Sequence, residues 1–503
     1  MGKRVLGAST PHPFNEMRCT DTSLRETQRM SRGQGPLVVL LVWAAIYLPG
    51  LGSLEIKGEE GRRILPAIAM LETGNYIVPQ VGSEQYFSKP PLVNWLVAAS
   101  FKIFGVRNEW TARLPSALCV LAVAIAFITV ARRSLGAPGS TIAALIWLTN
   151  FGIIEKGRSI EIEALYVSLF ALALICWLSW WEQERSPWLT WTVPWIFLGL
   201  GWLAKAPIHV IFFYAIVIAV LWRSRELRRI GNLPHLFGII IMMAIFAAWA
   251  IPAKMEGGAE MTRTWQGQIW LALADFKLRG WITNIPRSLG YFLPWLVFLP
   301  LVSGTRFSPA RQIDIMRGLL WGIGLPLLIV DLIPGWLPRY GMPLVAPATW
   351  LLAATLTAED LQWPRWLGGK KFLPQDRQRT VALIVILTCI CISIYAFLIV
   401  PHLQKKQKVK AIAAQVDAIV PASQRLYAVD PDFQPFLFYV RAPLVYIRRI
   451  EDVPREARYF LVQSENEGVA ETAQQWLPLH PERVLSVEDY RHWKTSLFAI
   501  KTP

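Results

Sequence analysis

Residues 59–91 read EEGRRILPAIAMLETGNYIVPQVGSEQYFSKPP and lie between two apolar segments, 36–53 and 111–131, each long enough to cross a membrane. Two adjacent carboxylates open the stretch, two arginines follow within a helical turn, and a lysine flanked by aromatic residues and prolines closes it. A segment with so many charges of both signs is a poor membrane span, so we expect it at the bilayer surface. An amphipathic interfacial helix with ordinary surface ion pairs would have the same appearance.

The composition around this stretch is that of an integral membrane protein. Of 503 residues, 54% are hydrophobic and only 17% are charged, against roughly 25% charged in soluble domains. We therefore predict a polytopic α-helical membrane protein with about eleven spans. The expected spans are 36–53, 111–131, 138–155, 163–181, 189–204, 207–222, 235–253, 286–304, 318–335, 341–358 and 380–400.

The apolar pattern also divides the chain into three parts. Residues 1–35 are polar and basic and predict a disordered cytoplasmic tail, 36–400 form the membrane domain, and 401–503 alternate strand-like and helix-like runs, as in a small α/β domain. Within the membrane domain, 54–110 is the first extracytoplasmic loop. Its apolar part 91–105 is too short to span and indicates a re-entrant or interfacial helix.

The lysines and arginines favour one orientation. With the N-terminus inside, the short basic loops all face the cytoplasm, and the net charge of +16 is largely this positive-inside signature, so it needs no nucleic-acid partner. We expect a multi-pass protein of the cell inner (plasma) membrane. The C-terminal domain then falls outside, although its lysine-rich start (405–410) favours the opposite side.

Several ionisable residues stand at the predicted membrane boundary on the outer side. Glu161 and Glu163 open a span, Lys205 lies between two spans with hardly any loop, and Arg339 and Tyr340 precede another span. Each charge alone could reach the interface by extending its side chain. Together with the 59–89 stretch they indicate one outward-facing polar cavity, because charges at this depth normally face a protein interior or water.

These motifs resemble a known family. The stretch EEGRRI…YFSKPPLVNWL, followed by FGVRNEWTARLPSAL, GRSIEIEAL, GWLAKAP and LPRYGMPLVAPA, is similar to bacterial polyprenyl-phosphate-sugar glycosyltransferases of the C-type superfamily. The lipid A aminoarabinose transferase and the protein O-mannosyltransferases are members of that superfamily. The similarity runs from about residue 37 to 360 and leaves out the C-terminal domain.

The resemblance implies roles for individual residues. The family's catalytic carboxylate falls on Glu59 and its acidic neighbour on Glu60, while an acid of the second loop falls on Glu163. Its arginine falls on Arg62 and its box tyrosine on Tyr86, and its phosphate-binding lysine falls on Lys89. We expect Lys205, Arg339 and Tyr340 to complete the binding of the donor phosphate, and Glu60 to pair with Arg63 three residues on.

Two departures from the family pattern affect the chemistry. The catalytic position holds Glu where the family mostly has Asp, which leaves open whether Glu59 or Glu60 acts. Ser88 replaces an acid of the box, and residues 254–285 contain no histidine. The sequence therefore predicts no bound metal and no other cofactor.

The residues themselves suit such a reaction. A carboxylate can take the proton of an attacking hydroxyl, and lysine and arginine can stabilise a departing phosphate. We predict an inverting transfer of a sugar from a polyprenyl-phosphate donor to an envelope lipid, glycan or protein, on the extracytoplasmic face. A transporter or flippase of lipid-linked sugars is the alternative, although the two halves show no internal repeat. A non-catalytic scaffold explains the boundary charges poorly.

Overall fold

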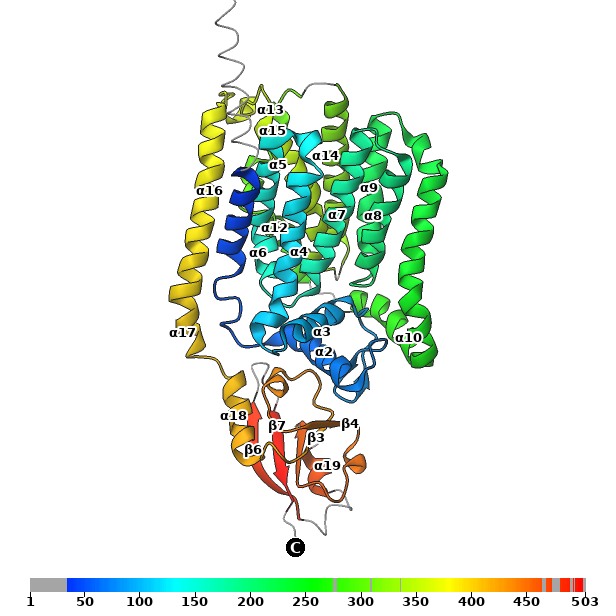
Figure 1. Ribbon diagram of the computed structural model, residues 1–503, viewed down its shortest axis with the longest axis vertical. Helices are drawn as coiled ribbons and strands as arrows, with labels where there is room; N and C mark the ends of the chain where they lie inside the picture. The colour runs from blue at the N-terminus through cyan, green and yellow to red at the C-terminus, as the bar shows by residue number, and fades with distance from the viewer. Residues whose placement is uncertain are drawn as a thin grey trace, which may run out of the picture.

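The computed structural model describes residues 34–274, 278–307, 310–334, 336–463, 467–472, 480–488, 492 and 494–500. The predicted tail 1–35 therefore lies almost wholly outside the described residues. The chain forms a helical bundle with a small mixed-sheet domain at one end (Figure 1).

The bundle is built from apolar helices that run back and forth along one direction (Figure 1). Gln34–Tyr47 is the first of them. The others are α4 (Glu109–Thr129), α5 (Arg132–Leu148), α6 (Phe151–Gly157), α7 (Ile162–Glu182), α8 (Pro187–Trp202), α9 (Ile208–Arg223), α10 (Leu233–Ala274), α11 (Leu278–Ile282), α12 (Asn284–Gly290), α13 (Leu301–Gly304), α14 (Ala310–Leu332), α15 (Val345–Thr357) and α16 (Pro374–Ile394), with η2 (Leu227–Gly231), η3 (Trp295–Phe298), η4 (Pro338–Leu344) and η5 (Arg365–Leu367) between them. A π-helical turn, η6 (Tyr395–Ile399), and α17 (Val400–Gln404) extend α16.

The predicted spans fall on these helices, but two of them are broken: 138–155 runs from α5 into α6 across a 60° bend, and 286–304 covers Asn284–Gly290 and Trp295–Gly304, which meet at 93°. The number of membrane crossings stays a prediction. By length and hydropathy, five helices of the described residues qualify as spans, or up to seven if two bent pairs count as one span each. The remainder are short: α15, for example, has 13 residues and is about 20 Å long at 1.5 Å per residue.

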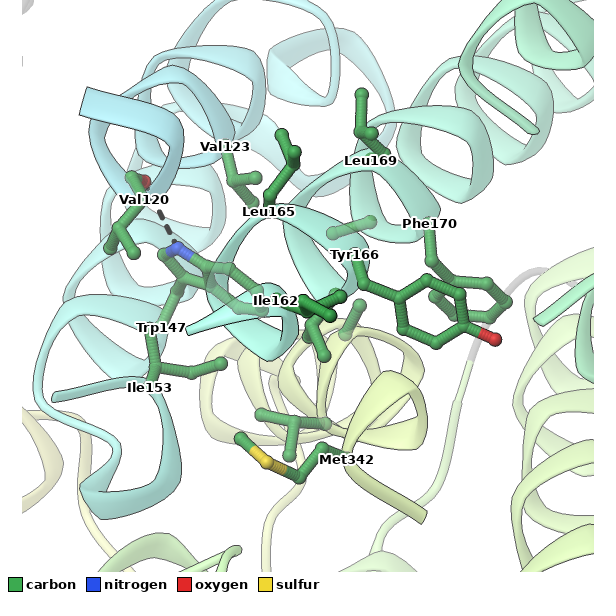
Figure 2. Packing of buried hydrophobic residues seen from close by; sticks show 14 of the residues in the cluster. Val120, Val123, Trp147, Ile153, Ile162, Leu165, Tyr166, Leu169, Phe170 and Met342 are labelled. Carbon is green, nitrogen blue, oxygen red and sulfur yellow. Dashed lines mark hydrogen bonds between the residues drawn. The ribbon is translucent and has the colours of Figure 1, made fainter. Parts of the chain in front are cut away.

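Burial separates the centre of the bundle from its lipid-facing rim. In the most apolar 18-residue stretch of α7, 94% of the residues are buried inside the protein. In the corresponding stretches of α10 and of the helix that begins at Pro374, only 22% are buried. Figure 2 shows α7 residues such as Ile162 and Leu165 packed against α4, α5 and Met342 of η4, and the indole of Trp147 donating a hydrogen bond to Val120 O (3.1 Å). The exposed apolar side chains of the rim need a hydrocarbon solvent, which supports membrane insertion.

The charged stretch 59–91 lies at one end of the bundle, within a cap of short elements (Figure 1). This cap contains η1 (Gly58–Glu60), α2 (Gly61–Thr73), the two-stranded hairpin β1 (Gln80–Val81) and β2 (Glu84–Gln85), and α3 (Leu92–Phe104). Helix α2 ends at Gly74, which adopts a left-handed conformation (φ 75°) that glycine tolerates without strain. The segment 91–105 is thus a short helix, as predicted.

The C-terminal part is a five-stranded mixed sheet with order β4-β3-β5-β7-β6. Strand β3 pairs in parallel with β4 and β5, whereas β5–β7 and β6–β7 are antiparallel. The elements are α18 (Val409–Ile419), β3 (Leu426–Val429), η7 (Pro435–Phe438), β4 (Leu444–Ile447), η8 (Ile450–Asp452), β5 (Tyr459–Gln463), α19 (Glu467–Thr472), β6 (Glu482–Glu488) and β7 (Lys494–Ala499). The expected α/β character is confirmed, but β6 was missed because ERVLSVE contains few apolar residues. The domain lies at the same end of the bundle as α2 and α3 (Figure 1).

Candidate active site

Glu59 lies in the turn that leads into α2. Gly58 starts this turn with a left-handed backbone (φ 57°), and the Glu59 side chain is 52% exposed. Its Oε2 atom lies 3.5 Å from Nη1 of Arg62 and 3.9 Å from Nη2 of Arg63. This carboxylate is therefore open to a ligand and stands beside positive charge.

Glu60 points the other way, into the protein. Its carboxylate accepts two hydrogen bonds from the guanidinium of Arg113 (2.8 and 2.7 Å) and one from the backbone N–H of Ile160 (3.1 Å). The predicted pairing of Glu60 with Arg63 is wrong. Adjacent residues on a helical turn diverge by about 100°, so Glu60 faces α4 while Arg63 stays on the side of Glu59. Glu60 is a buried structural carboxylate.

The two neighbouring arginines also diverge. The guanidinium of Arg62 lies over the ring of Phe433 in the C-terminal domain, 3.8 Å from its centroid. The buried Arg63 instead donates from Nη1 to the hydroxyl of Tyr86 (3.1 Å). The predicted phosphate role of Arg62 thus finds no support in the geometry, because the arginine that faces the interior of the site is Arg63.

Glu163 binds two of the predicted cations. It opens α7, and its Oε1 atom accepts a hydrogen bond from Nζ of Lys205 (2.9 Å) and lies 3.3 Å from Nε of Arg339. Lys205 Nζ also lies 4.6 Å from the ring centroid of Tyr340 and 5.5 Å from that of Tyr166. Three separate segments, namely the start of α7, the α8–α9 link and η4, thus meet at one buried carboxylate.

The contact between Arg339 and Glu163 is an ion pair without hydrogen-bond geometry. The buried Nε–H of Arg339 has no hydrogen-bond acceptor among the described residues. An unpaired buried donor costs about 1–3 kcal/mol. Such a donor therefore marks a place where a ligand atom would be bound.

Lys89 joins the same cluster from the first loop. Its Nζ donates to Ser88 O (2.9 Å). The pKa of Lys89 is lowered from its usual value to about 8, first by burial and then by the positive charges of Lys205, Arg63 and Arg339, while Glu163 opposes the change. Two cations contact Glu163, and Lys89 and Arg63 lie near enough for their charges to interact with this group. We call these residues (Arg63, Lys89, Lys205, Arg339 and Glu163) the cation cluster.

Glu161 belongs to a second ion-pair group beside this cluster. Nζ of the buried Lys156 lies 2.7 Å from Oε1 of Glu155 and 3.1 Å from Glu161. Although Glu161 and Glu163 are two residues apart, they have different cationic partners. Sequence reasoning placed both acids in one cavity and did not single out Lys156.

The structure thus brings together Glu163, Lys89, Lys205, Arg339 and Tyr340, and connects Glu59 and Tyr86 to them through Arg63. Sequence reasoning missed Arg63 and Arg113 as members of the site and its support. A signal for Arg113 exists, because an arginine in the first turns of a membrane helix needs a buried acid. Among the described residues, no group of three or more His, Cys, Asp or Glu side chains is arranged to hold a metal ion.

Comparison with solved structures identifies the class of fold. The chain superposes on the crystal structure of ArnT from Cupriavidus metallidurans bound to undecaprenyl phosphate with a TM-score of 0.67. The superposition covers 92% of this chain and 97% of that one at 16% identity. The chain therefore has the fold of that ArnT structure.

Sequence comparisons narrow the class. Residues 88–251 match the family described as dolichyl-phosphate-mannose-protein mannosyltransferase. The chain is 27% identical, over 64% of its length, to the undecaprenyl phosphate-α-4-amino-4-deoxy-L-arabinose arabinosyl transferase of Pseudomonas savastanoi pv. phaseolicola. It is 28% identical, over 66% of its length, to the enzyme of the same name numbered 2 in Pseudomonas fluorescens. The matches span 61% and 57% of those relatives' own length. The chain is thus similar in sequence to these arabinosyl transferases over about two thirds of its own length.

Proposed function

We propose that this chain transfers a sugar from a polyprenyl-phosphate-linked donor to an acceptor of the cell envelope. The observation that carries the proposal is the cation cluster, which gathers four cations and only one carboxylate, Glu163, at one end of the bundle. An excess of positive charge in a partly buried place stabilises an anion. A polyprenyl phosphate presents its anion at the end of a hydrocarbon chain, which suits a charged site at the end of apolar helices.

The relatives support the class of donor. The names of the similar arabinosyl transferases specify a sugar on undecaprenyl phosphate, and the ArnT crystal structure of the same fold contains undecaprenyl phosphate. We infer the same lipid carrier for this chain. The 4-amino-4-deoxy-arabinose of those names is the first sugar to test, and lipid, glycan and protein acceptors all remain candidates.

The geometry suggests how the transfer would proceed. Glu59 takes the proton of an acceptor hydroxyl, and the hydroxyl oxygen forms its bond to the anomeric carbon from the face opposite the phosphate. The bond between that carbon and the phosphate oxygen breaks, and its electron pair stays on the phosphate. Because the phosphate leaves as an anion, it needs cations and no proton donor. Lys89, Arg63 and Arg339 are placed to supply them.

The cluster also bears on where the reaction takes place. Its charges gather at one end of the bundle together with the C-terminal domain, as expected for chemistry on one face of the membrane. By the positive-inside rule this is the extracytoplasmic face of the inner membrane. A transporter would need access to its site from both faces, and no feature of the described residues favours it.

The direct test is transfer by the purified protein from synthetic undecaprenyl-phosphate sugars to extracted envelope lipids and glycans. Lys89→Ala should weaken donor binding as well as turnover, because the phosphate is present in both the ground and the transition state. Lys102→Ala is the matched control, since Lys102 is an exposed lysine on α3 at the same end of the bundle. Unchanged donor affinity in Lys89→Ala would contradict the phosphate site.

A further inference from the structure

The C-terminal domain is anchored by a buried carboxylate of the loop that carries Glu59. Glu55, 4% exposed, accepts hydrogen bonds from three successive backbone N–H groups at the start of α18, those of Lys408, Val409 and Lys410 (3.1, 3.0 and 3.0 Å). These N–H groups have no partner within the helix, and a negative charge at a helix N-terminus is stabilising. A residue of the membrane domain thus caps a helix more than 350 positions away.

A tyrosine provides the second attachment. Tyr439 of the C-terminal domain accepts a hydrogen bond from the backbone N–H of Ile56 (2.7 Å) and donates one to Oε1 of Glu109 (2.9 Å). Lys410 Nζ lies 2.5 Å from the same Glu109 oxygen. Ile56 and the start of α4 therefore also form hydrogen bonds or ion pairs with the C-terminal domain.

The third contact reaches the first turn of α2. The ring of Phe433 covers the guanidinium of Arg62 at 3.8 Å, and the Phe433 carbonyl lies so close to Gly61 that a Cβ atom there would come within 2.5 Å of it. The domain thus packs against the two residues that follow the Glu59–Glu60 pair. Its aromatic ring also holds the Arg62 guanidinium, which could otherwise turn toward the cation cluster.

Arg113 connects these contacts to the catalytic turn. Its guanidinium holds Glu60 and also donates to the backbone carbonyls of Leu51, Leu54 and Glu55. The buried Arg113 therefore binds both the loop that contacts the C-terminal domain and the turn that carries Glu59.

The phosphate-binding cations have a different support. Lys205 and Arg339 are held by Glu163 at the start of α7, which belongs to the membrane bundle. A displacement of the C-terminal domain would therefore move Glu59 relative to these cations.

We propose that the C-terminal domain positions the catalytic turn, with Glu55 and Phe433 as its positioning residues. The proposal rests on the transferase function proposed above. It assigns the domain a place in the reaction beyond the accessory role that its sequence suggests: it holds Glu59 at the donor and keeps Arg62 away from the cation cluster. Undocking should lower the rate of the chemical step and leave phosphate binding intact, because a misplacement of about 1 Å can cost up to about 10²-fold in rate.

The test uses a reporter of docking at the exposed edge of the interface. Arg448 Nη2 lies 3.8 Å from Glu84 Oε1, and both side chains are largely exposed. Cysteines at 84 and 448, in a full-length protein without its native cysteines, can be joined by a short bismaleimide. The rate of this cross-linking reports the fraction of molecules in which the C-terminal domain is docked.

Glu55→Gln keeps the size of the side chain but replaces one acceptor oxygen by a donor, and Phe433→Ala removes the ring from Arg62. In both variants we expect slower joining, kcat lowered about tenfold or more, and undecaprenyl-phosphate affinity within about twofold of the parent. Once the thiols are joined, kcat should recover. Phe433→Tyr should retain activity, and Glu456→Gln, an exposed carboxylate of the same domain, is the control for charge.

A variant that cross-links slowly but has a normal kcat would overturn the proposal. A variant that cross-links as fast as the parent protein but has a lowered kcat would overturn it as well. Loss of phosphate binding together with kcat, without recovery on joining, would also count against it, since general damage explains that result. If the parent protein transfers no sugar from any donor, the proposed function fails. That outcome is distinct from all of these.

Discussion

At the scale of single residues, the two adjacent acids of η1 have opposite environments. Glu59 is half exposed and lies 3.5 Å or more from two arginines, whereas Glu60 is buried and accepts four hydrogen bonds. A general base must exchange a proton with a ligand, so it needs access. Glu59 meets this requirement, and Glu60 does not.

Glu59→Gln and Glu60→Gln should therefore fail in different ways. Glu59→Gln removes the base and should lower transfer by about 10²-fold or more with donor binding intact. Glu60→Gln leaves the buried Arg113 without its counter-ion, which costs roughly 3–5 kcal/mol when a buried pair is broken. Transfer assays, donor binding and thermal unfolding in detergent separate the two effects. Near-normal turnover of Glu59→Gln would show that the base lies elsewhere.

The neighbouring arginines offer a second comparison. Because Arg63 faces Lys89 and Tyr86 while Arg62 lies on Phe433, Arg63→Ala should weaken undecaprenyl-phosphate binding about tenfold or more. Arg62→Ala should change this affinity by less than about twofold, and it serves as the matched control. Equilibrium binding of a labelled undecaprenyl phosphate measures both. A larger loss for Arg62→Ala would mean that the arginines exchange places when the donor binds.

The lowered pKa of Lys89 makes phosphate binding dependent on pH. In the free protein Lys89 loses its proton as the pH rises through about 8, whereas bound phosphate raises that pKa by holding the charged form. Affinity should be flat below pH 8 and weaken above it, by at most about tenfold per pH unit. The second ionisation of a phosphate monoester, near pH 6, lies below this window. Lys89→Arg should bind with little change from pH 7.5 to 9.5, and a pH-independent parent protein would contradict the assignment.

At the scale of elements, Glu163 joins the start of α7, the α8–α9 link and η4. Three chain segments that end at the same face of the bundle bring their charges within 3.3 Å of one carboxylate. Because two cations share this acid, part of their charge is left uncompensated. The site is therefore held together by an ion pair and still attracts an anion.

Glu163→Gln should lower the thermal stability of the protein and increase the stabilisation that bound undecaprenyl phosphate provides. Loss of the carboxylate leaves the buried Lys205 without its counter-ion, at a cost on the order of 3–5 kcal/mol, and also removes the ion-pair partner of the partly exposed Arg339. Bound phosphate can replace the missing negative charge, so undecaprenyl phosphate should raise the Tm of Glu163→Gln more than that of the parent protein. Thermal unfolding with and without the lipid measures both effects. Equal shifts in Tm would show that the phosphate lies away from Glu163.

At the scale of the whole molecule, the first loop and the C-terminal domain lie at the same end of the bundle (Figure 1). Their contacts through Glu55 and Tyr439 require both to be on one side of the membrane. The lysine-rich segment 405–410, which favours a cytoplasmic domain, partly serves this interface, because Lys410 pairs with Glu109.

Thiol labelling in intact cells should confirm this common side. Single cysteines at the exposed positions Glu84 and Ser423 should react with a membrane-impermeant maleimide added from outside. A cysteine at the exposed Ser186, in the link after α7 at the opposite end of the bundle, should react only after the membrane is opened. Labelling of 84 and 423 from different sides would contradict the interface, and labelling of both from the cytoplasm would reverse the orientation.

The sequence by itself determined the class of fold and the helical segments, and it named most of the residues that the structure brings together in the candidate site. These follow from local properties: apolar length for the helices, and the cost of a charge near lipid for Glu163, Lys205 and Arg339. The same reasoning recognised the α/β character of residues 401–503 from alternating apolar runs. It overlooked β6, whose strand is stabilised by its pairing with β7 rather than by apolar residues of its own.

Only the tertiary structure determined which charged residues pair with each other. Glu60 binds Arg113, 53 residues away, and not Arg63, the neighbour that the helical spacing suggests. Arg62 keeps a 3.5 Å contact with Glu59 but also lies on a ring of the C-terminal domain. A pair three residues apart on an exposed helix gains only about 0.2–0.5 kcal/mol. A buried cation that would otherwise lack a counter-ion costs several kcal/mol. Avoiding that cost outweighs the small gain of a local pair, and it depends on contacts that no local pattern contains.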